Sequence, residues 1–467
     1  MSHNPDLHHA APERVLPTLN ADGTRRRIRP KLAHGRFLRR RRVVAYALIA
    51  LFFLIPFIPM NGKPLILLDL AHREFTFLGM TFLPTDSMLL MLLGLSIAMT
   101  VLFLTALFGR VWCGWACPQT VYMEFLYRPI ERLFEGTPAQ QRKIDEGHRF
   151  GLRRIGKFAA FLVVSMFVAH TFLSYFVGVD TLYHWVQASP ADHPVGFMIM
   201  AGVTGLMLFD FGYFREQVCL VACPYGRLQA VLIDKKSLIV GYDLRRGEPR
   251  GKPKKKAVGA ELGDCIDCGA CVHTCPTGID IRDGLQMECI TCTQCIDACD
   301  AIMDRVDKPR GLIRYTSQDE LEGKGRKLFR LRVVVYPVLL AAAALLFVYF
   351  LGTRASTDVT ILRTAAPFTQ FSDGRVSTQV LVKVTNDTGI EHSYDVSIEG
   401  APDAELIIPE PHFTLAPRKS KTLNLIVVSA PDRFRDGRRR VTVRVKDDAR
   451  FDDRIEHDLL GPMGGVK

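Results

Sequence analysis

Long apolar runs alternate with basic, polar segments along the first 351 residues of the chain. A bilayer core of roughly 30 Å needs about 20 residues of helix to cross it. Five runs approach or exceed this length, at approximately 43–60, 87–108, 155–178, 195–214 and 332–351. Pro56 interrupts the first run and Asp210 lies near the end of the fourth. The pattern predicts an α-helical membrane bundle of five transmembrane spans.

From about residue 357 the pattern changes to a period of two, which is typical of half-buried strands. Asn386-Asp387-Thr388-Gly389 and Asp436-Gly437 supply turns between the strands. The alternating apolar positions are Val380, Val382 and Val384, then Tyr394, Val396 and Ile398, then Leu423, Leu425 and Val427, then Val441, Val443 and Val445. We expect an all-β, immunoglobulin-like sandwich over 357–460, with an interaction or scaffolding role.

Basic residues predict which side of the membrane each loop faces. The net charge is +12, and Lys and Arg gather in the tail 1–42, the loop 109–154 and the segment 215–331. Basic loops stay in the cytoplasm, so these segments are expected there. We expect the protein in a bacterial inner membrane, with its C-terminal domain in the periplasm. This distribution favours membrane lipid over nucleic acid as a partner. The tail is too long and polar for a cleavable signal peptide.

Twelve cysteines fall in short-spaced groups, and eight of them form two runs with the spacing of bacterial [4Fe–4S] sites. Each tight loop supplies three thiolates, and the fourth comes from the other run. The first predicted ligand set is Cys265, Cys268, Cys271 and Cys299, and the second is Cys289, Cys292, Cys295 and Cys275. We therefore expect an α+β ferredoxin-like domain with two clusters at about 255–310.

Structural zinc is the alternative for these eight cysteines, but zinc prefers four ligands from two separated Cys-x2-Cys knuckles. The register of the two runs favours clusters. Pro276 follows the last cysteine of the first run, whereas Asp300 stands at the matching position of the second. We expect this difference to leave ligation intact and to alter the turn beside the first cluster.

The remaining four cysteines repeat a second motif, Cys-x-x-Ala-Cys-Pro, where two spans end. Cys113 and Cys117 follow the second span, and Cys219 and Cys223 follow the fourth, 106 residues further on. Spans one to four are therefore interpreted as two parallel repeats of a helix hairpin and a Cys-x3-Cys-Pro element. A pseudo-twofold axis along the membrane normal would bring the four thiols together.

This spacing favours reactive thiolates or soft-metal ligands. Cysteines at i and i+4 of a helix lie about 5–6 Å apart at Cβ, which suits a shared metal better than a disulfide. The following proline can start a new helix, whose dipole would lower the pKa of Cys117 and Cys223. Soft thiolates favour Cu(I). The alternative is that all four are apolar residues buried at helix ends.

Other candidate ligands in the spans are favoured as packing residues. His170 in the third span could bind haem or copper, but no second histidine faces it from another span. Met198, Met200 and Met207 in the fourth span suit copper, although methionine commonly fills gaps in apolar helices.

Together, these features resemble the cytochrome c oxidase accessory protein family, which is encoded beside cbb3-type oxidases. The resemblance covers nearly the whole chain beyond the N-terminal tail. It implies reduction of Cu(II) to Cu(I) for the oxidase, with copper handled at Cys113, Cys117, Cys219 and Cys223. The implied partners are a cytoplasmic electron donor, a copper transporter or chaperone, and oxidase subunits; a homodimer stays open.

The resulting hypothesis is a cupric reductase in which electrons pass from a cytoplasmic donor through the clusters to Cu(II) at the membrane-edge thiols. A second hypothesis is an electron conduit between a cytoplasmic donor, the quinone pool and an extracytoplasmic reductase, without copper. A third is an assembly scaffold whose clusters sense redox state. Dependence on copper supply separates the first two, and assembly that survives loss of the clusters identifies the third.

Overall fold

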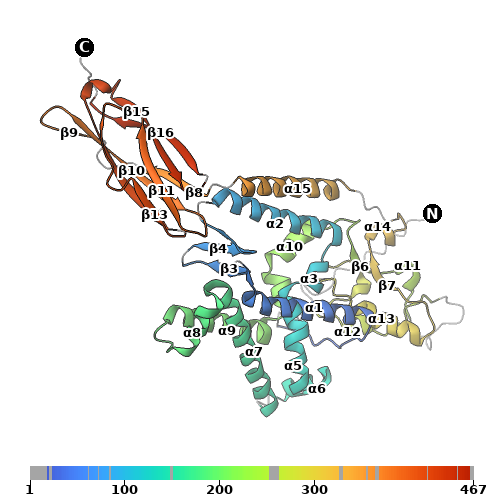
Figure 1. The fold of residues 1–467 in the computed structure, drawn as a ribbon. Helices are drawn as coiled ribbons and strands as arrows, with labels where there is room; N and C mark the ends of the chain where they lie inside the picture. Colours follow the sequence, from blue (N-terminus) through green and yellow to red (C-terminus); the bar gives the residue numbers. More distant parts are fainter. Residues whose placement is uncertain are drawn as a thin grey trace. The chain divides into compact units, whose positions relative to one another are not determined.

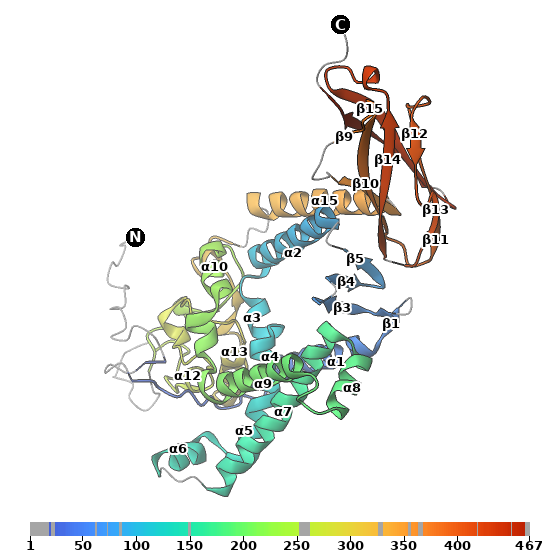
Figure 2. The same ribbon diagram turned by 90° about the vertical axis from the view of Figure 1, so that its left-hand side faces the viewer.

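The chain forms two compact units, Met1–Phe347 and Val348–Lys467, in a computed structural model. The structure describes residues 18–19, 24–60, 63–71, 73–83, 86–147, 151–251, 262–325, 330–353, 356–362, 368–417, 419–449 and 451–462. Residues 252–261, which include a run of lysines, and most of the first 23 residues therefore lie outside the described residues. Figures 1 and 2 show the ribbon in two orientations.

Four described helices are long and apolar enough to cross a membrane. They are α2 (Ser87–Phe108), α7 (Leu152–Val177), α9 (Pro194–Phe209) with its continuation η5 (Asp210–Phe214), and α15 (Leu331–Gly352). In Figures 1 and 2, α15 runs alongside α2. At its start, Nη2 of Arg330 donates a hydrogen bond to the carbonyl of Ala106 at 3.3 Å. Four of the five predicted spans are thereby confirmed as apolar helices.

The predicted span 43–60 differs from the other four. Helix α1 (Arg36–Leu54) starts among arginines, passes into the short helix η2 (Ile55–Phe57) and gives way to strand β1 (Pro59–Met60). Pro56 lacks a backbone donor and the chain becomes extended soon after it. At 1.5 Å per residue, residues 43–57 reach about 22 Å, short of the roughly 30 Å of a bilayer core.

Short strands fill the connection between α1 and α2. Strand β1 pairs with β2 (Lys63–Pro64), and a three-stranded sheet follows. Its strands are β3 (Ile66–Asp69), β4 (Glu74–Phe77) and β5 (Met80–Phe82). The connection between α7 and α9 contains helix α8 (Val179–Gln187).

Each of the two cysteine elements at the ends of spans continues into further helices. After α2 come α3 (Val111–Trp115), α4 (Pro118–Tyr122), η4 (Met123–Tyr127), α5 (Arg128–Glu135) and α6 (Pro138–Glu146). After η5 come η6 (Val218–Ala222) and α10 (Pro224–Leu232). These helices carry the second cysteine motif.

The ferredoxin-like domain is α+β, as expected. Its antiparallel strands are β6 (Ile239–Tyr242) and β7 (Ile313–Thr316). Its helices are α11 (Leu244–Gly247), α12 (Ala270–His273), η8 (Ile281–Asp283), α13 (Gln294–Arg305) and α14 (Gln318–Leu321). Apolar residues of both strands and of α13 form its core with the cysteines.

The N-terminal basic segment packs against the ferredoxin-like domain at residues 31–38. The amide of Lys31 donates to the carbonyl of His273 at 2.9 Å, and the Thr274 hydroxyl donates back to the Lys31 carbonyl at 2.7 Å. The buried carboxylate of Asp297 accepts from the amides of Phe37 and Leu38 at 3.1 and 2.7 Å. An acidic side chain of α13 therefore caps the first turn of α1, where unpaired amides need an acceptor.

The C-terminal unit is a sandwich of two antiparallel sheets. One sheet has the order β12 (Glu405–Ile407), β14 (Ser420–Ser429), β10 (Val376–Asn386), β8 (Thr357–Leu362), with β9 (Thr369–Gln370) beside β10. The other has the order β13 (His412–Leu415), β11 (His392–Glu399), β15 (Arg438–Asp447), β16 (Asp452–Leu460). All twelve predicted inward residues are buried in one core. The period-two prediction is confirmed because alternate side chains of a strand face the same side.

Candidate functional site

The two cysteine runs of the ferredoxin-like domain have the same local backbone. Asp267 and Gly269 take positive φ (54° and 66°) in the first loop, and Thr291 and Thr293 do so (56° and 62°) in the second. Left-handed residues let the chain curl tightly. A helix then begins in each run, α12 in the first and α13 in the second. The sequence repeat is therefore a structural repeat.

The eight cysteines line two cavities. The first cavity is lined by Cys265, Cys268, Cys271 and Cys299. The second is lined by Cys275, Cys289, Cys292 and Cys295, with Cys271 also reaching it. Each of these sets combines three cysteines of one run with the last cysteine of the other.

The donors around these cavities fit iron–sulfur clusters. Burial raises the pKa of both Cys271 and Cys292 to about 12. Such thiols stay protonated near neutral pH unless a metal displaces the proton. Four sulfur donors around one space are the ligand set that a [4Fe–4S] cluster requires.

Asp300, which stands where the first run has Pro276, lies inside α13. Its carboxylate accepts a hydrogen bond from the amide of Gly311 at 3.0 Å and lies 3.6 Å from Nη2 of Arg36. The helix therefore continues past Cys299 instead of turning, and Asp300 ties it to α1 and to the loop before β7.

The Cys-x3-Cys-Pro repeat is present in the backbone as well as in the sequence. Gly109 ends α2 with φ 57° and ψ −126°, and Arg215, 106 residues later, ends η5 with φ 54° and ψ −120°. Cys117 and Cys223 are both extended, and the proline after each one begins a helix, α4 or α10. The two segments therefore have similar backbones at the end of the span and at the second cysteine of the motif.

Reciprocal contacts join the two repeats. Tyr225 on α10 shares a 2.8 Å hydrogen bond with Thr105 on α2, so the second short helix touches the first long one. At the equivalent position of the first repeat, Gln119 on α4 donates to Asp210 of η5 at 2.9 Å. Contacts that exchange partners in this way support the predicted pseudo-twofold relation.

The four membrane-edge thiols lie close enough to influence one another's ionisation. Burial, followed by the neighbouring Cys117, raises the pKa of Cys113 to about 11. Burial, followed by Cys117 and Cys113, raises the pKa of Cys219 to about 12, and Cys223 adds to both shifts. The Cys113 thiol donates to Oε1 of the fully buried Gln229 at 3.2 Å.

The expected lowering of the pKa of Cys117 by the helix dipole is wrong. Burial raises this pKa, although the amides of Gln119 and Thr120 at the start of α4 pull it down. Desolvation of the thiolate raises the pKa more than the amides at the start of α4 lower it, because the sulfur is largely removed from water. A metal ion at this site would therefore have to displace protons as it binds.

These thiols do not form a compact single-ion site. A compact site for one ion needs three or more His, Cys, Asp or Glu ligand atoms within about 4.8 Å of one another. Among the described residues, His392, Asp447 and Asp448 form such a group, whereas the four thiols do not. Metal coordination at the four thiols would require the two elements to draw closer, or a ligand larger than one ion.

The first Cys-x3-Cys-Pro element packs directly against the second cysteine run. A Cβ atom on Gly114 would lie 2.5 Å from the carbonyl oxygen of Ile290, 2.8 Å from that of Thr291 and 2.9 Å from Cα of Cys292. Nη1 of Arg110 donates to the carbonyl of Met287 in the same segment. Only glycine permits this close approach of two backbones.

Two buried arginines lie at this junction. Nε of Arg41 donates to the carbonyl of Gly114 at 2.9 Å, and the charge of Arg41 favours the thiolate of Cys292. Arg110 favours the thiolates of both Cys113 and Cys289. Positive charge between the two cysteine groups thus stabilises anionic sulfur on both sides.

His170, which the sequence favours as a packing residue, makes a hydrogen bond within its own helix and also lines a cavity. Nδ1 of His170 bonds to the carbonyl of Met166 in its own helix at 2.8 Å. His193, which lies just before α9 and not within a span, lines the same cavity of ≈ 230 Å³ as His170 and Met200. The sequence alone does not reveal this, since the shared cavity depends on how α7 packs against the segment before α9.

Strand pairing in the sandwich brings together one group that the sequence did not indicate. Nδ1 of His392 lies 2.8 Å from Oδ1 of Asp448. Asp447 pairs with Tyr394, two residues after this histidine. More than 50 residues separate the two sides of the group, so only the register of β11 and β15 reveals it.

Three family models match the chain. A model described as "4Fe-4S dicluster domain" matches residues 214–318, and one described as "4Fe-4S binding domain" matches residues 90–136, which include Cys113 and Cys117. A model described as "IG-like fold at C-terminal of FixG" matches residues 347–462. These matches agree with the observed positions of the cysteine segments and the sandwich.

Three relatives extend over most of the chain. Protein RdxB of Cereibacter sphaeroides is 32% identical over 455 residues, 92% of this chain and 95% of the relative. Protein RdxA of the same organism is 34% identical over 80% of this chain and 82% of its own length. Nitrogen fixation protein FixG of Rhizobium meliloti is 33% identical over 82% of this chain and 81% of its own length.

Apolar spanning helices, iron–sulfur motifs and these relatives identify a membrane iron–sulfur electron-transfer protein. The chain belongs to the family of RdxB, RdxA and FixG, the oxidase accessory family that its motifs resemble.

Proposed function

We propose that this protein reduces Cu(II) to Cu(I) during assembly of a cbb3-type cytochrome c oxidase. The proposal rests chiefly on the backbone contact at Gly114, which brings the first Cys-x3-Cys-Pro element against the loop that carries Cys292. In this assignment, Cu(II) is the substrate, and Cys113, Cys117, Cys219 and Cys223 bind it after the two cysteine elements draw closer together. Soft thiolates hold the product Cu(I) more readily than harder ions.

The cysteines that line the two cavities would hold two [4Fe–4S] clusters, in the sets Cys265, Cys268, Cys271 and Cys299, and Cys275, Cys289, Cys292 and Cys295. Such clusters supply and accept single electrons when bound. Gly114 keeps the copper-binding element close to Cys292, and Arg110 favours anionic sulfur on both sides of the junction.

The contacts of the N-terminal segment support a fifth membrane crossing. Lys31 and Phe37 bind the ferredoxin-like domain, so they lie on the same membrane face as that domain. Helix α2 ends on this face, where Gly109 abuts Leu238, and must therefore start on the other face. Residues 38–86 then cross the bilayer once, and 43–57 are their apolar part, helped by local thinning.

A tag inserted at residues 61–62 is expected to be accessible from the face opposite to the ferredoxin-like domain. Protease protection in oriented membrane vesicles measures this, with a tag at residue 253 as the matched marker of the ferredoxin side. Accessibility of both tags from the same face would contradict the fifth crossing. By the positive-inside rule, we assign the ferredoxin side to the cytoplasm and the sandwich to the periplasm.

Anaerobic protein with both clusters reduced is expected to reduce about two equivalents of Cu(II) per chain, since each cluster gives one electron. Each Cu(II) takes up one electron and becomes Cu(I). A Cu(I)-specific chelator measures the product, while visible absorption follows reoxidation of the protein. Unchanged absorption after Cu(II) addition, with no Cu(I) formed, would rule out copper as the acceptor.

Gly114→Ala is expected to slow this reaction by about a hundredfold, because displacement of reacting groups by about 1 Å can have an effect of that size. The new methyl group would meet backbone atoms, which cannot rotate away. Gly94→Ala is the matched control, because a Cβ there has no atom within 4 Å. Equal rates for the two variants would show that the contact at Gly114 is irrelevant to electron transfer.

A second candidate ligand for the membrane-edge thiols is a further iron–sulfur cluster. The family model matching residues 90–136 covers Cys113 and Cys117, and no three of the four sulfurs, all in the described part of the chain, lie within 4.8 Å of one another. Iron content separates the two assignments: about eight iron atoms per chain for two clusters, or about twelve for three.

The quinone conduit is also supported by one observation. An apolar cavity of ≈ 720 Å³ is lined by Trp112, Trp115 and Tyr225 beside the first cysteine element. Reduction of the clusters by a soluble quinol analogue, with no response to Cu(II), would favour this function over copper reduction.

A further inference from the structure

A cavity of ≈ 540 Å³ with a strongly basic wall lies at the ends of two spans. It is found where α7 begins and η5 ends, on the membrane face that carries the cysteine elements. The lining charges are Arg25, Arg27, Arg29, Arg154, Lys157 and Arg215, against Glu131 and Asp145. This is called the basic cavity below.

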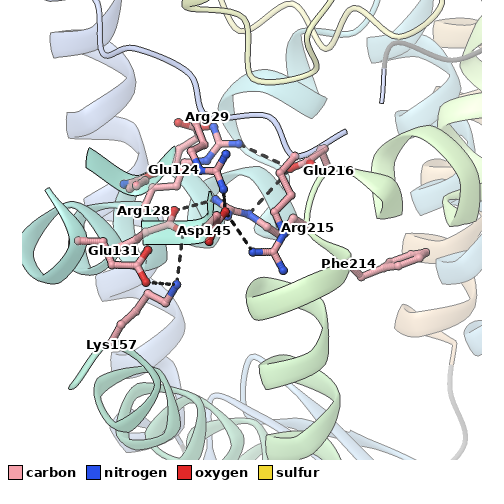
Figure 3. Close-up of polar contacts among 12 residues, drawn as sticks. Arg29, Glu124, Arg128, Glu131, Asp145, Lys157, Phe214, Arg215 and Glu216 are labelled. Carbon is pink, nitrogen blue, oxygen red and sulfur yellow. Dashed lines mark hydrogen bonds and ion pairs between the residues drawn. The ribbon is translucent and has the colours of Figure 1, made fainter. Parts of the chain in front are cut away.

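Acidic side chains neutralise only part of this charge. Both terminal nitrogens of Arg215 donate to Glu131, at 3.1 and 2.8 Å, and Lys157 lies 2.7 Å from Glu135. Figure 3 shows Arg29, Lys157 and Arg215 around Glu131 and Asp145. The ion-paired network of described residues joins seven cations to five carboxylates, which leaves a net charge of +2. Its members are Arg25, Arg27, Arg29, Arg128, Arg154, Lys157, Arg215, Glu124, Glu131, Glu135, Asp145 and Glu216.

The cations are crowded and some of their donors are unused. Asp145 alone is shared by Arg27, Arg29 and Arg154. Burial, and then the nearby Arg27, lower the pKa of Arg29. The buried Nε atoms of Arg25 and Arg215 have no hydrogen-bond partner among the described residues. An additional anion would relieve this repulsion and could accept hydrogen bonds from the cations that line the cavity.

One side of the basic cavity is apolar. Phe158 and Gly212 line it, and a Cβ on Gly212 would approach the Phe158 ring at 3.3 Å. Both residues belong to membrane-spanning helices, so this wall lies at the depth of the lipid. A ligand with a phosphate and an attached acyl chain matches both walls, whereas a free ion matches only the basic one.

We propose that the basic cavity binds a phosphate anion, supplied by the headgroup of an anionic phospholipid. Arginine forks suit phosphate oxygens, and basic pockets between spanning helices are known to hold such headgroups. The bound phosphate would connect Arg27 and Arg29 of the N-terminal segment to α5 and α7. The same segment binds the ferredoxin-like domain through Lys31 and Phe37, so the lipid would also stabilise the docked position of that domain.

The test measures binding of short-chain phosphatidylglycerol, short-chain phosphatidylcholine and inorganic phosphate to the full-length protein in detergent. We expect phosphatidylglycerol to bind at least about tenfold more tightly than phosphatidylcholine. Arg27→Gln/Arg29→Gln is expected to weaken phosphatidylglycerol by about thirtyfold, at roughly 1 kcal/mol per basic residue. Arg26→Gln/Arg40→Gln, which removes two exposed charges outside the cavity, should change binding less than about twofold.

Unchanged cluster absorption shows that a variant is folded, and Arg27→Lys/Arg29→Lys should restore most of the binding. Inorganic phosphate that binds as tightly as phosphatidylglycerol would identify a free anion as the ligand and overturn the lipid assignment. Equal affinity for the two lipids, or equal loss in the cavity variant and its surface control, would overturn the site itself.

Discussion

Replacement of Cys292 by serine is expected to remove about half of the iron and to destabilise the ferredoxin-like domain. Cys292 is buried and lines the second cavity with Cys275, Cys289 and Cys295. Two [4Fe–4S] clusters bring about eight iron atoms, so one lost cluster leaves about four. Because ligand binding and folding are coupled at such sites, thermal stability should fall together with the iron.

Iron analysis, EPR of the reduced protein and thermal denaturation measure this effect. Cys113→Ser is the matched control, since it removes a thiol of the membrane-edge group and should leave about eight iron atoms. Loss of about a third of the iron from that control would instead favour a third cluster at the membrane edge. Wild-type protein that binds zinc in place of iron after anaerobic reconstitution would exclude the cluster assignment.

The second large effect is expected from Cys113→Ser/Cys117→Ser, which should abolish Cu(II) reduction while both clusters remain. Loss of a residue that only hydrogen-bonds to a metal ligand already lowers metal affinity or activity 10–100-fold. Loss of two proposed ligands should therefore slow the reaction by more than about a hundredfold. Chelation of Cu(I) gives the rate, and visible absorption confirms that the clusters are retained.

Met198→Leu/Met207→Leu is the matched control, because it removes two thioether sulfurs of α9 instead of two thiols. Its rate of Cu(II) reduction should equal that of the wild type. If the double serine variant still reduces Cu(II) at the wild-type rate, the membrane-edge thiols are not the copper site. If the methionine variant alone loses the reaction, thioethers of α9 bind the substrate instead.

Spacing within short segments determined much of the site. The eight cysteines between 265 and 299 predicted the two groups that line the two cavities, because ligands in tight loops are fixed by local geometry. The 106-residue repeat predicted equivalent backbones, and Gly109 and Arg215 take nearly the same dihedral angles. Neither result requires knowledge of how distant segments pack.

Burial reversed one local prediction. The proline after Cys117 does begin a helix, as the sequence indicates, and its amides do favour the thiolate. The net pKa is nevertheless raised, because desolvation depends on every segment that surrounds the sulfur. The first span shows the same limit: its apolar run to residue 60 is visible in the sequence, whereas its last two residues, Pro59 and Met60, form a strand that pairs with Lys63 and Pro64.

The sequence alone determined the spans at 87–108, 155–178, 195–214 and 332–351, the two cysteine motifs and the inward-facing residues of the sandwich. Each follows from a period or spacing within one segment. Tertiary structure decided that Gly114 touches the loop at Cys292, that Asp297 caps α1, and that basic residues from the N-terminus line a cavity at the start of α7. These contacts join residues more than 100 positions apart, and packing of the whole chain sets them rather than any local pattern.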